Sequence, residues 1–91
     1  MVTAIVLLRC ARGDVNKVAE TLAEQHGVSE VYSVSGNYDL VAMIRVANND
    51  LLASTVTDAI AEIDGIEHTE TMLAFRTYSR HDLEEMFSIG Q

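Results

Sequence analysis

Two β-rich runs meet at a turn in residues 28–46, and this stretch constrains the fold more than any other. β-branched and aromatic residues precede the turn, and the almost unbroken apolar run Leu40–Val46 follows it. Between the runs, Gly36 can adopt a positive φ without a Cβ clash, Asn37 tolerates the left-handed region, and Asp39 can accept hydrogen bonds from backbone N–H groups. We therefore predict an antiparallel β-hairpin, with the rest of the chain arranged around it as two similar halves.

Helical periodicity is present on both sides of this hairpin. Apolar residues recur at helical spacing after Asp14, a candidate N-cap, and we expect this first helix to stop at Gly27. A second helix is expected to begin after Asn48 or Asn49 and to end at Gly65. Its buried stripe comprises Leu52, Val56, Ala59, Ile60 and Ile63.

The remaining segments complete a βαββαβ order. Val2–Cys10 is short, apolar and β-branched, and residues 66–78 return to β character. With right-handed crossovers, this order predicts a ferredoxin-like α+β sandwich, in which an antiparallel four-stranded sheet carries both helices on one face. Residues 1–78 are expected to form one domain, and the tail, 79–91, one short helical turn.

Both faces of the predicted sheet are apolar. In the first strand Val6 and Leu8 point to one side and Ile5 and Leu7 to the other, and the run Leu40–Val46 repeats this pattern. A half-exposed antiparallel sheet normally alternates apolar with polar residues. Because two helices can cover only one face, we predict that a second copy of the chain covers the other, which gives a face-to-face homodimer.

The chain is strongly acidic, and this limits its partners. Its net charge of −8 comes from 14 acidic and 6 basic residues, whereas binding to a phosphate backbone needs clustered Lys and Arg. We therefore expect no direct contact with nucleic acid. The sequence shows neither an export signal nor an apolar run of the roughly 20 residues that span a bilayer, and the single cysteine, Cys10, cannot form an internal disulfide. A cytoplasmic protein without membrane association is expected.

Two motifs at a fixed separation resemble those of a known family. The sequence G-N-Y-D at 36–39 matches a Gly-x-Tyr/Phe-Asp hairpin, and G-I at 65–66 followed by T-E-T at 69–71 matches Gly-Val followed by Thr-x-Thr. In a βαββαβ chain, this combination resembles the effector-binding domain of the Lrp/AsnC feast/famine transcription regulators, over residues 2–78. Full-length members carry an N-terminal helix-turn-helix, whereas this chain begins at the first strand. The resemblance therefore implies a stand-alone effector domain.

The resemblance also implies an effector site and partners. Members of the family dimerise through the sheet, dimers assemble into rings that are usually octamers, and small effectors such as amino acids bind between dimers. Carried over residue by residue, the implied site comprises Gly36, Asn37, Tyr38, Asp39, Leu40, Thr69, Glu70, Thr71 and Met72. The implied function is amino-acid sensing and oligomerisation that modulates transcription indirectly, either alone or by mixed assembly with full-length relatives.

Simpler interpretations of these residues remain open. Asp39 is either a turn residue bonded to local amides or the acceptor for the ammonium group of an effector. Thr69 and Thr71 share one face of their strand, and His68, Glu70 and Met72 share the other. This segment is either a solvated edge strand or the lining of a small polar pocket with one apolar wall.

An enzyme is the alternative function. Dimeric ferredoxin-like barrels also resemble cofactor-free monooxygenases and small isomerases, and fold alone does not decide between these classes. Those enzymes usually need a roomy cavity that holds Asn, Trp or His, whereas apolar residues fill the helix stripes here and Trp is absent. His26, His68 and His81 lack metal-ligand spacing, and Cys10 is expected to be a core or rim residue. We therefore expect no catalysis, metal or cofactor.

Overall fold

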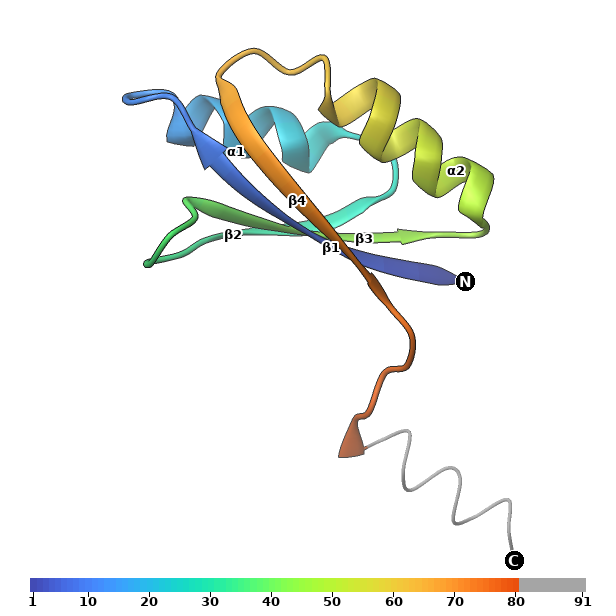
Figure 1. Cartoon of the computed structure of the whole chain (residues 1–91). Helices are drawn as coiled ribbons and strands as arrows, with labels where there is room; N and C mark the ends of the chain where they lie inside the picture. The colour runs from blue at the N-terminus through green and yellow to red at the C-terminus, as the bar shows by residue number, and fades with distance from the viewer. Residues whose placement is uncertain (81–91) are drawn as a thin grey trace, which may run out of the picture.

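The computed structural model describes residues 1–80 as strands and helices in the order βαββαβ (Figure 1). The strands are β1 (Val2–Cys10), β2 (Val28–Ser33), β3 (Leu40–Val46) and β4 (Ile66–Ala74). The helices are α1 (Val15–Glu24) and α2 (Asn49–Ala53), and α2 continues directly as a π-helical segment, η1 (Ser54–Ile60). Of the tail, 79–91, for which a short helical turn was predicted, residues 81–91 lie outside the described residues.

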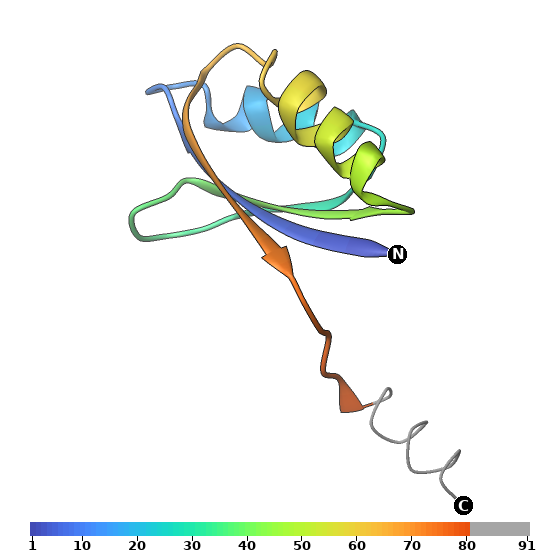
Figure 2. The ribbon, with the colours of Figure 1, turned by 45° about the vertical axis from the view of Figure 1, so that its right-hand side comes forward.

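The strands form one antiparallel sheet in the order β2-β3-β1-β4, with β3 and β1 in the centre. Both helices lie on the same side of this sheet (Figure 1, Figure 2). This arrangement confirms the predicted ferredoxin-like α+β fold. Along β1, Ile5 lies opposite Met43 of β3 and Met72 of β4. Within residues 1–80, no helix has the length and apolarity needed to cross a membrane.

Alternate residues of the two central strands form the core beneath the helices. Ala4, Val6 and Leu8 of β1 are fully buried and pack with side chains from both helical segments. The other apolar residues that are at most 1% exposed are Val18, Leu22, Leu40, Ala42, Ile44 and Ile60. The layer between the helices and the sheet is therefore filled by aliphatic side chains, as the helical periodicity predicted.

The helices cover the sheet unevenly. α1 packs mainly against β2 and β3, and the second helix packs mainly against β3 and β1. On β4, Thr71 pairs with the core residue Val6, so Thr69, Thr71 and Leu73 face the helical side. All three are nevertheless exposed, and Leu73 is 50% exposed. Edge strand β4 is therefore accessible on both of its faces.

The side of the sheet away from the helices is apolar at its centre, in agreement with the pattern of the sequence. We call this surface the open face, and define it by six residues: Ile5, Leu7, Tyr32, Val41, Met43 and Met72. Tyr32 and Met72 are 49% and 43% exposed, while the four residues on β1 and β3 are partly buried. At one end of the open face, Arg45 forms an ion pair with Glu30 at 3.2 Å. The described chain therefore carries a continuous apolar strip across all four strands.

Some boundaries differ from the sequence-based expectation. The last strand ends at Ala74 rather than at residue 78, because Ala74 pairs with Thr3 and β1 extends only one residue further, to Val2. Asp14 occupies the N-cap of α1 but makes no side-chain capping bond. By contrast, the side chain of Asn48 caps α2 by accepting a hydrogen bond from the Leu51 amide at 2.9 Å.

The second helix is α-helical for one turn and then π-helical, although its sequence predicted a single α-helix. Two hydroxyl side chains at the transition bond carbonyls four residues earlier. Ser54 Oγ donates to the Asp50 carbonyl at 3.1 Å, and Thr55 Oγ1 donates to the Leu51 carbonyl at 2.9 Å. Such bonds compete with backbone amides for the same acceptors and distort a helix locally. We attribute the change of helix type to this competition.

Gly27 provides a test of close packing between η1 and the sheet. It has a φ of +93°, and an added Cβ would lie 2.8 Å from Val46 Cγ1 and 3.1 Å from Thr55 Oγ1. Gly13 has a similar φ of +88° but open space around it. We predict that Gly13→Ala lowers the free energy of unfolding by about 1 kcal/mol through backbone strain. Gly27→Ala should cost about 1 to 3 kcal/mol more, because the added methyl group overpacks the site.

Urea unfolding at a fixed protein concentration measures both losses. Gly13→Ala carries a similar backbone strain. The difference between the two losses in the free energy of unfolding therefore measures the cost of overpacking at Gly27. Equal losses would show that the side chains of Thr55 and Val46 can shift to accommodate a methyl group at Gly27 without a cost in stability.

Candidate functional site

The loop between β2 and β3 forms the predicted hairpin connection. It spans residues 34–39, and its ends are joined by a hydrogen bond of 3.0 Å from the Val34 amide to the Asp39 carbonyl. Gly36 has a φ of +108° with open space around its Cα, so its conformation requires glycine for backbone reasons rather than for packing. This confirms the hairpin and the role assigned to Gly36 in its turn.

Asp39 attaches the loop to the end of β1. Its Oδ2 accepts a hydrogen bond of 2.8 Å from the Cys10 amide, and its own amide donates to the Leu8 carbonyl at 2.9 Å. The carboxylate therefore binds an amide on a distant strand instead of a local one. One oxygen serves this bond, and a carboxylate has further acceptor sites for a ligand.

Tyr38 connects the two segments that the sequence assigned to one site. Its hydroxyl donates a hydrogen bond of 2.6 Å to Glu70 Oε2, and its ring stacks on His68 with centroids 6.4 Å apart and planes at 22°. Arg9 approaches the same ring, with its guanidinium carbon 5.6 Å from the centroid. The hairpin and β4 are thus brought into direct contact by one aromatic side chain.

Arg9 was absent from the predicted site, and His68 was placed only on the same strand face as Glu70 and Met72, yet both contact Tyr38. Arg9 Nε and Nη2 donate to the Asn37 carbonyl at 3.3 and 3.2 Å, and Arg9 lies directly opposite His68 in the pairing of β1 with β4. The sequence did contain a signal, because strand alternation places Arg9 on the same side as Ile5 and Leu7. The missing information was the register of β4.

The other predicted residues are divided between two surfaces. Thr69 and Thr71 face the helical side of β4, whereas Glu70 and Met72 face the open side. Leu40 is fully buried in the core, so neither its side chain nor its backbone is exposed at the loop. The contacts described above join Arg9 to Asn37 and Tyr38, and Tyr38 to Glu70, while Asp39 binds the end of β1. The two threonines lie on the other side of the strand.

The electrostatics of this cluster have clear causes. The hydrogen bond to Glu70 is the main reason that the pKa of Tyr38 lies above its usual 10.0, with burial and the charge of Glu70 adding to it. Burial is the main cause that raises the pKa of the Cys10 thiol, followed by the charges of Asp39, Asp14 and Glu67. A thiol with a raised pKa is protonated at neutral pH, which makes Cys10 a poor nucleophile.

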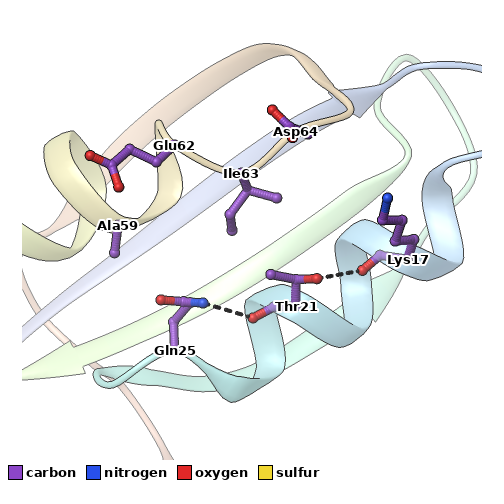
Figure 3. A pocket seen from close by; sticks show the side chains of 7 residues that line it. All are labelled: Lys17, Thr21, Gln25, Ala59, Glu62, Ile63 and Asp64. Atoms are coloured by element: carbon purple, nitrogen blue, oxygen red, sulfur yellow. Dashed lines mark hydrogen bonds between the residues drawn. The ribbon is translucent and has the colours of Figure 1, made fainter.

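A separate groove lies between α1 and the segment that follows η1, with a volume of about 470 Å³ (Figure 3). It is lined by Lys17, Thr21, Gln25, Ala59, Glu62, Ile63 and Asp64. Thr21 and Gln25 donate their side-chain hydrogen bonds to carbonyls of α1 itself, at 2.9 and 3.1 Å. The groove contains none of the predicted site residues. We place the candidate site at the hairpin, because there Arg9 of β1, Tyr38 of the loop and Glu70 of β4 contact one another in sequence.

Comparison with known sequences gives one family. The family model described as the Lrp/AsnC ligand binding domain matches residues 3–83. The HTH-type transcriptional regulator FL11 of Pyrococcus horikoshii is 36% identical over 75 residues, which are 82% of this chain and 49% of FL11. The chain therefore spans about half the length of this regulator. A relative of this kind points to a regulatory module and not to an enzyme.

Solved structures agree with this result. TTHA0845 from Thermus thermophilus is 48% identical, with a TM-score of 0.82, and the match covers 88% of this chain and 100% of that chain. PHS023 from Pyrococcus horikoshii is 33% identical, with a TM-score of 0.79, and the match covers 89% and 98% of the two chains. The fold described above is therefore shared with proteins of clearly related sequence.

The contact between Tyr38 and Glu70 gives a titration prediction. Because the pKa of Tyr38 is raised in the folded chain, the stabilisation from this contact is present below pH 10.0 and is lost as pH rises through the raised value. We predict that Glu70→Gln lowers the ionisation midpoint of Tyr38 toward the usual value. Ultraviolet difference absorbance measures phenolate formation, and Tyr32→Phe and Tyr78→Phe in the background leave Tyr38 as the reporter.

Glu62→Gln is the matched control, since it removes an exposed carboxylate far from Tyr38 on the helical groove. It should leave the midpoint unchanged. An unchanged midpoint in Glu70→Gln as well would mean that the hydroxyl of Tyr38 does not bind Glu70 in solution.

Proposed function

Because this chain belongs to the Lrp/AsnC ligand-binding domain family, we propose that it senses a small effector, an amino acid or a similar molecule, and couples binding to its own assembly. In this proposal, the module affects transcription indirectly, by assembling with full-length relatives. The site of binding is the hairpin loop together with β4, at a junction between dimers. The observation that carries the proposal is the hydrogen bond between Tyr38 and Glu70, which joins the two segments at 2.6 Å.

The chemistry of these segments suits a zwitterion. An amino acid presents an ammonium group that needs carboxylate or carbonyl acceptors and a carboxylate that needs N–H donors. Asp39 and Glu70 supply acceptors, while the turn around Gly36 supplies amides that lie outside the strands. Thr69 and Thr71 add hydroxyl groups on the helical side of β4, where no helix packs closely over them. These groups support an amino-acid effector over a purely apolar one.

The loop is also held in position before any ligand binds. Asp39 is bonded to β1 through both its carboxylate and its amide, and Asn37 accepts two bonds from Arg9. A site that is already ordered loses less conformational entropy when a ligand binds. This supports the hairpin as a binding element and not merely as a connection.

Assembly is proposed to begin at the open face. An apolar strip across four strands is unfavourable in water, and a second copy related by a two-fold axis covers it with the same strip. Dimers then associate into a higher oligomer, for which an octamer is the expectation from the family. An effector bound at a junction between dimers binds the higher oligomer more tightly than it binds separate dimers. This difference in affinity shifts the equilibrium toward the higher oligomer.

A charge placed on the open face should separate the subunits. We predict that Met43→Lys weakens dimerisation by several kcal/mol, because an unpaired ammonium would be buried among Ile5, Leu7 and the equivalent residues of the second copy. Sedimentation velocity at micromolar concentration measures the change from an assembled species to the 10.0 kDa chain.

Asn16→Lys introduces the same side chain on the exposed surface of α1 and should leave assembly intact. If the unaltered protein sediments as a 10.0 kDa monomer, the open face is not a dimer interface and this part of the proposal fails.

Substitutions at Asp39 separate its structural role, which is the hydrogen bond to the Cys10 amide, from its proposed role in binding the ammonium group of the effector. Asp39→Asn keeps an acceptor for the Cys10 amide but removes the charge, whereas Asp39→Ala removes both. We predict that Asp39→Asn keeps its thermal stability but binds amino acids at least about tenfold more weakly, since a hydrogen bond to a charged group contributes about 1.5 to 3 kcal/mol. Asp39→Ala should lose binding, ligand-dependent assembly and some stability together.

Two further variants complete this comparison. Gly36→Val should impair binding more severely, because a β-branched residue resists the φ of +108° and displaces the loop amides. Glu20→Ala, on the exposed side of α1, should change neither binding nor assembly. Calorimetry with the standard L-amino acids measures binding, and sedimentation measures assembly. If Asp39→Asn binds its amino acid as tightly as the unaltered protein does, the effector site does not include Asp39.

A further inference from the structure

We infer that Arg9 is the residue that binds the carboxylate of the effector, and this inference rests on the proposed function. Arg9 lies on β1, outside both segments that the sequence assigned to the site. It is nevertheless bonded to the first segment through Asn37 and lies opposite His68, next to the second segment. Arg9 would therefore give the site a specificity for ligands that carry a free carboxylate.

The guanidinium group of Arg9 is held in a defined orientation. Two of its nitrogens, Nε and Nη2, converge on the single carbonyl oxygen of Asn37, and its carbon lies 5.6 Å from the centroid of the Tyr38 ring. Guanidinium presents five N–H donors in a rigid planar fork. The edge formed by Nη1 and the second hydrogen of Nη2 is therefore left for a planar partner such as a carboxylate.

The charge around the site makes such a residue necessary. The chain carries a net charge of −8, and the acceptors proposed for the ammonium group, Asp39 and Glu70, would repel the carboxylate of the same ligand. A local cation, acting together with the amides of the turn, would offset this repulsion. Arg45 forms an ion pair with Glu30, whereas Arg9 forms none with a carboxylate of residues 1–80.

The other basic side chains are not placed for this task. Arg45 is engaged by Glu30 at the opposite end of the open face, and Lys17 lies on α1 in the helical groove. Arg12 lies in the turn between β1 and α1. Arg76 and Arg80 follow the end of β4, beyond Ala74. Arg9 is the described cation that contacts both the hairpin loop and the Tyr38 ring. Arg9 would supply the positive charge for the ligand carboxylate, while Asp39 and Glu70 would supply the negative charge for its ammonium group.

A purely structural role for Arg9 is the competing explanation, because its bonds to Asn37 also support the loop. The two roles differ in their dependence on the ligand carboxylate. We therefore compare the standard L-amino acids with the corresponding L-amino acid α-amides, which keep the ammonium group and the side chain but lack the negative charge. Arg9→Gln keeps an N–H donor for Asn37 and removes the positive charge.

The inference predicts a specific loss of discrimination. Calorimetry on the unaltered protein should show the acid binding more tightly than its amide. In Arg9→Gln, the affinity for the acid should fall at least about tenfold, as expected for the loss of a charge-assisted bond, while the affinity for the amide changes little. Arg45→Gln removes the same charge from the other end of the open face and should leave the acid-to-amide ratio unchanged.

The other outcomes are equally decisive. If Arg9→Gln weakens the acid and the amide by the same factor, Arg9 only supports the loop, and the inference is overturned while the proposed function stands. If the unaltered protein binds an acid and its amide equally, the carboxylate is not recognised and Arg9 has no such role. If it binds none of the amino acids, the proposed function and the inference fall together.

Discussion

The hydrogen bond between the Asp39 carboxylate and the Cys10 amide fixes the geometry on which the rest of this site depends. It forms where β1 ends and the hairpin loop returns, and it is accompanied by the bond from the Asp39 amide to the Leu8 carbonyl. Since β1 also pairs with β4, attaching the loop to β1 sets its position relative to β4. Tyr38 can then reach Glu70, and Arg9 can reach the carbonyl of Asn37.

The two sides of the sheet perform different tasks because the same strands alternate between them. On the helical side, aliphatic residues of β1 and β3 are sealed beneath α1 and η1 and supply the stability of the single chain. On the open side, an apolar centre is bordered by charged groups at both ends: the pair Glu30 and Arg45 at one, and the cluster around Tyr38 at the other. The hydroxyl of Tyr32 is the main cause that lowers the pKa of Glu30, followed by Arg45, so this end of the strip carries an ionised carboxylate at neutral pH.

The sequence was sufficient to predict the fold, because the patterns that indicate each strand, helix and turn are local. Strand alternation, helical spacing and the glycine-containing turn each depend on neighbouring residues, and together they predicted the βαββαβ order and the residues of the core. The contacts of the site are of another kind. Tyr38 binds Glu70 across 32 positions, and Arg9 binds Asn37 across 28, so both depend on how three strands are aligned.

This alignment includes a register shift between Arg9 and Cys10 in the pairing of β1 with β4, which no local pattern signals. The π-helical turn was also not predicted. Ser54 and Thr55 are compatible with an α-helix, and the sequence does not show that their hydroxyls donate hydrogen bonds to carbonyls of the preceding turn. Likewise, the end of the last strand was set by the limited length of β1 and not by the residues that follow Ala74.

The exposure of β4 has a consequence for the behaviour of the protein at high concentration. A strand at the edge of a sheet, accessible on both faces, offers unpaired backbone groups to any similar strand of another molecule. In this chain that edge carries Glu67 and Glu70 in a molecule of net charge −8, so two such edges repel each other as they approach. The polar composition of β4 therefore also protects the chain against uncontrolled strand-to-strand aggregation.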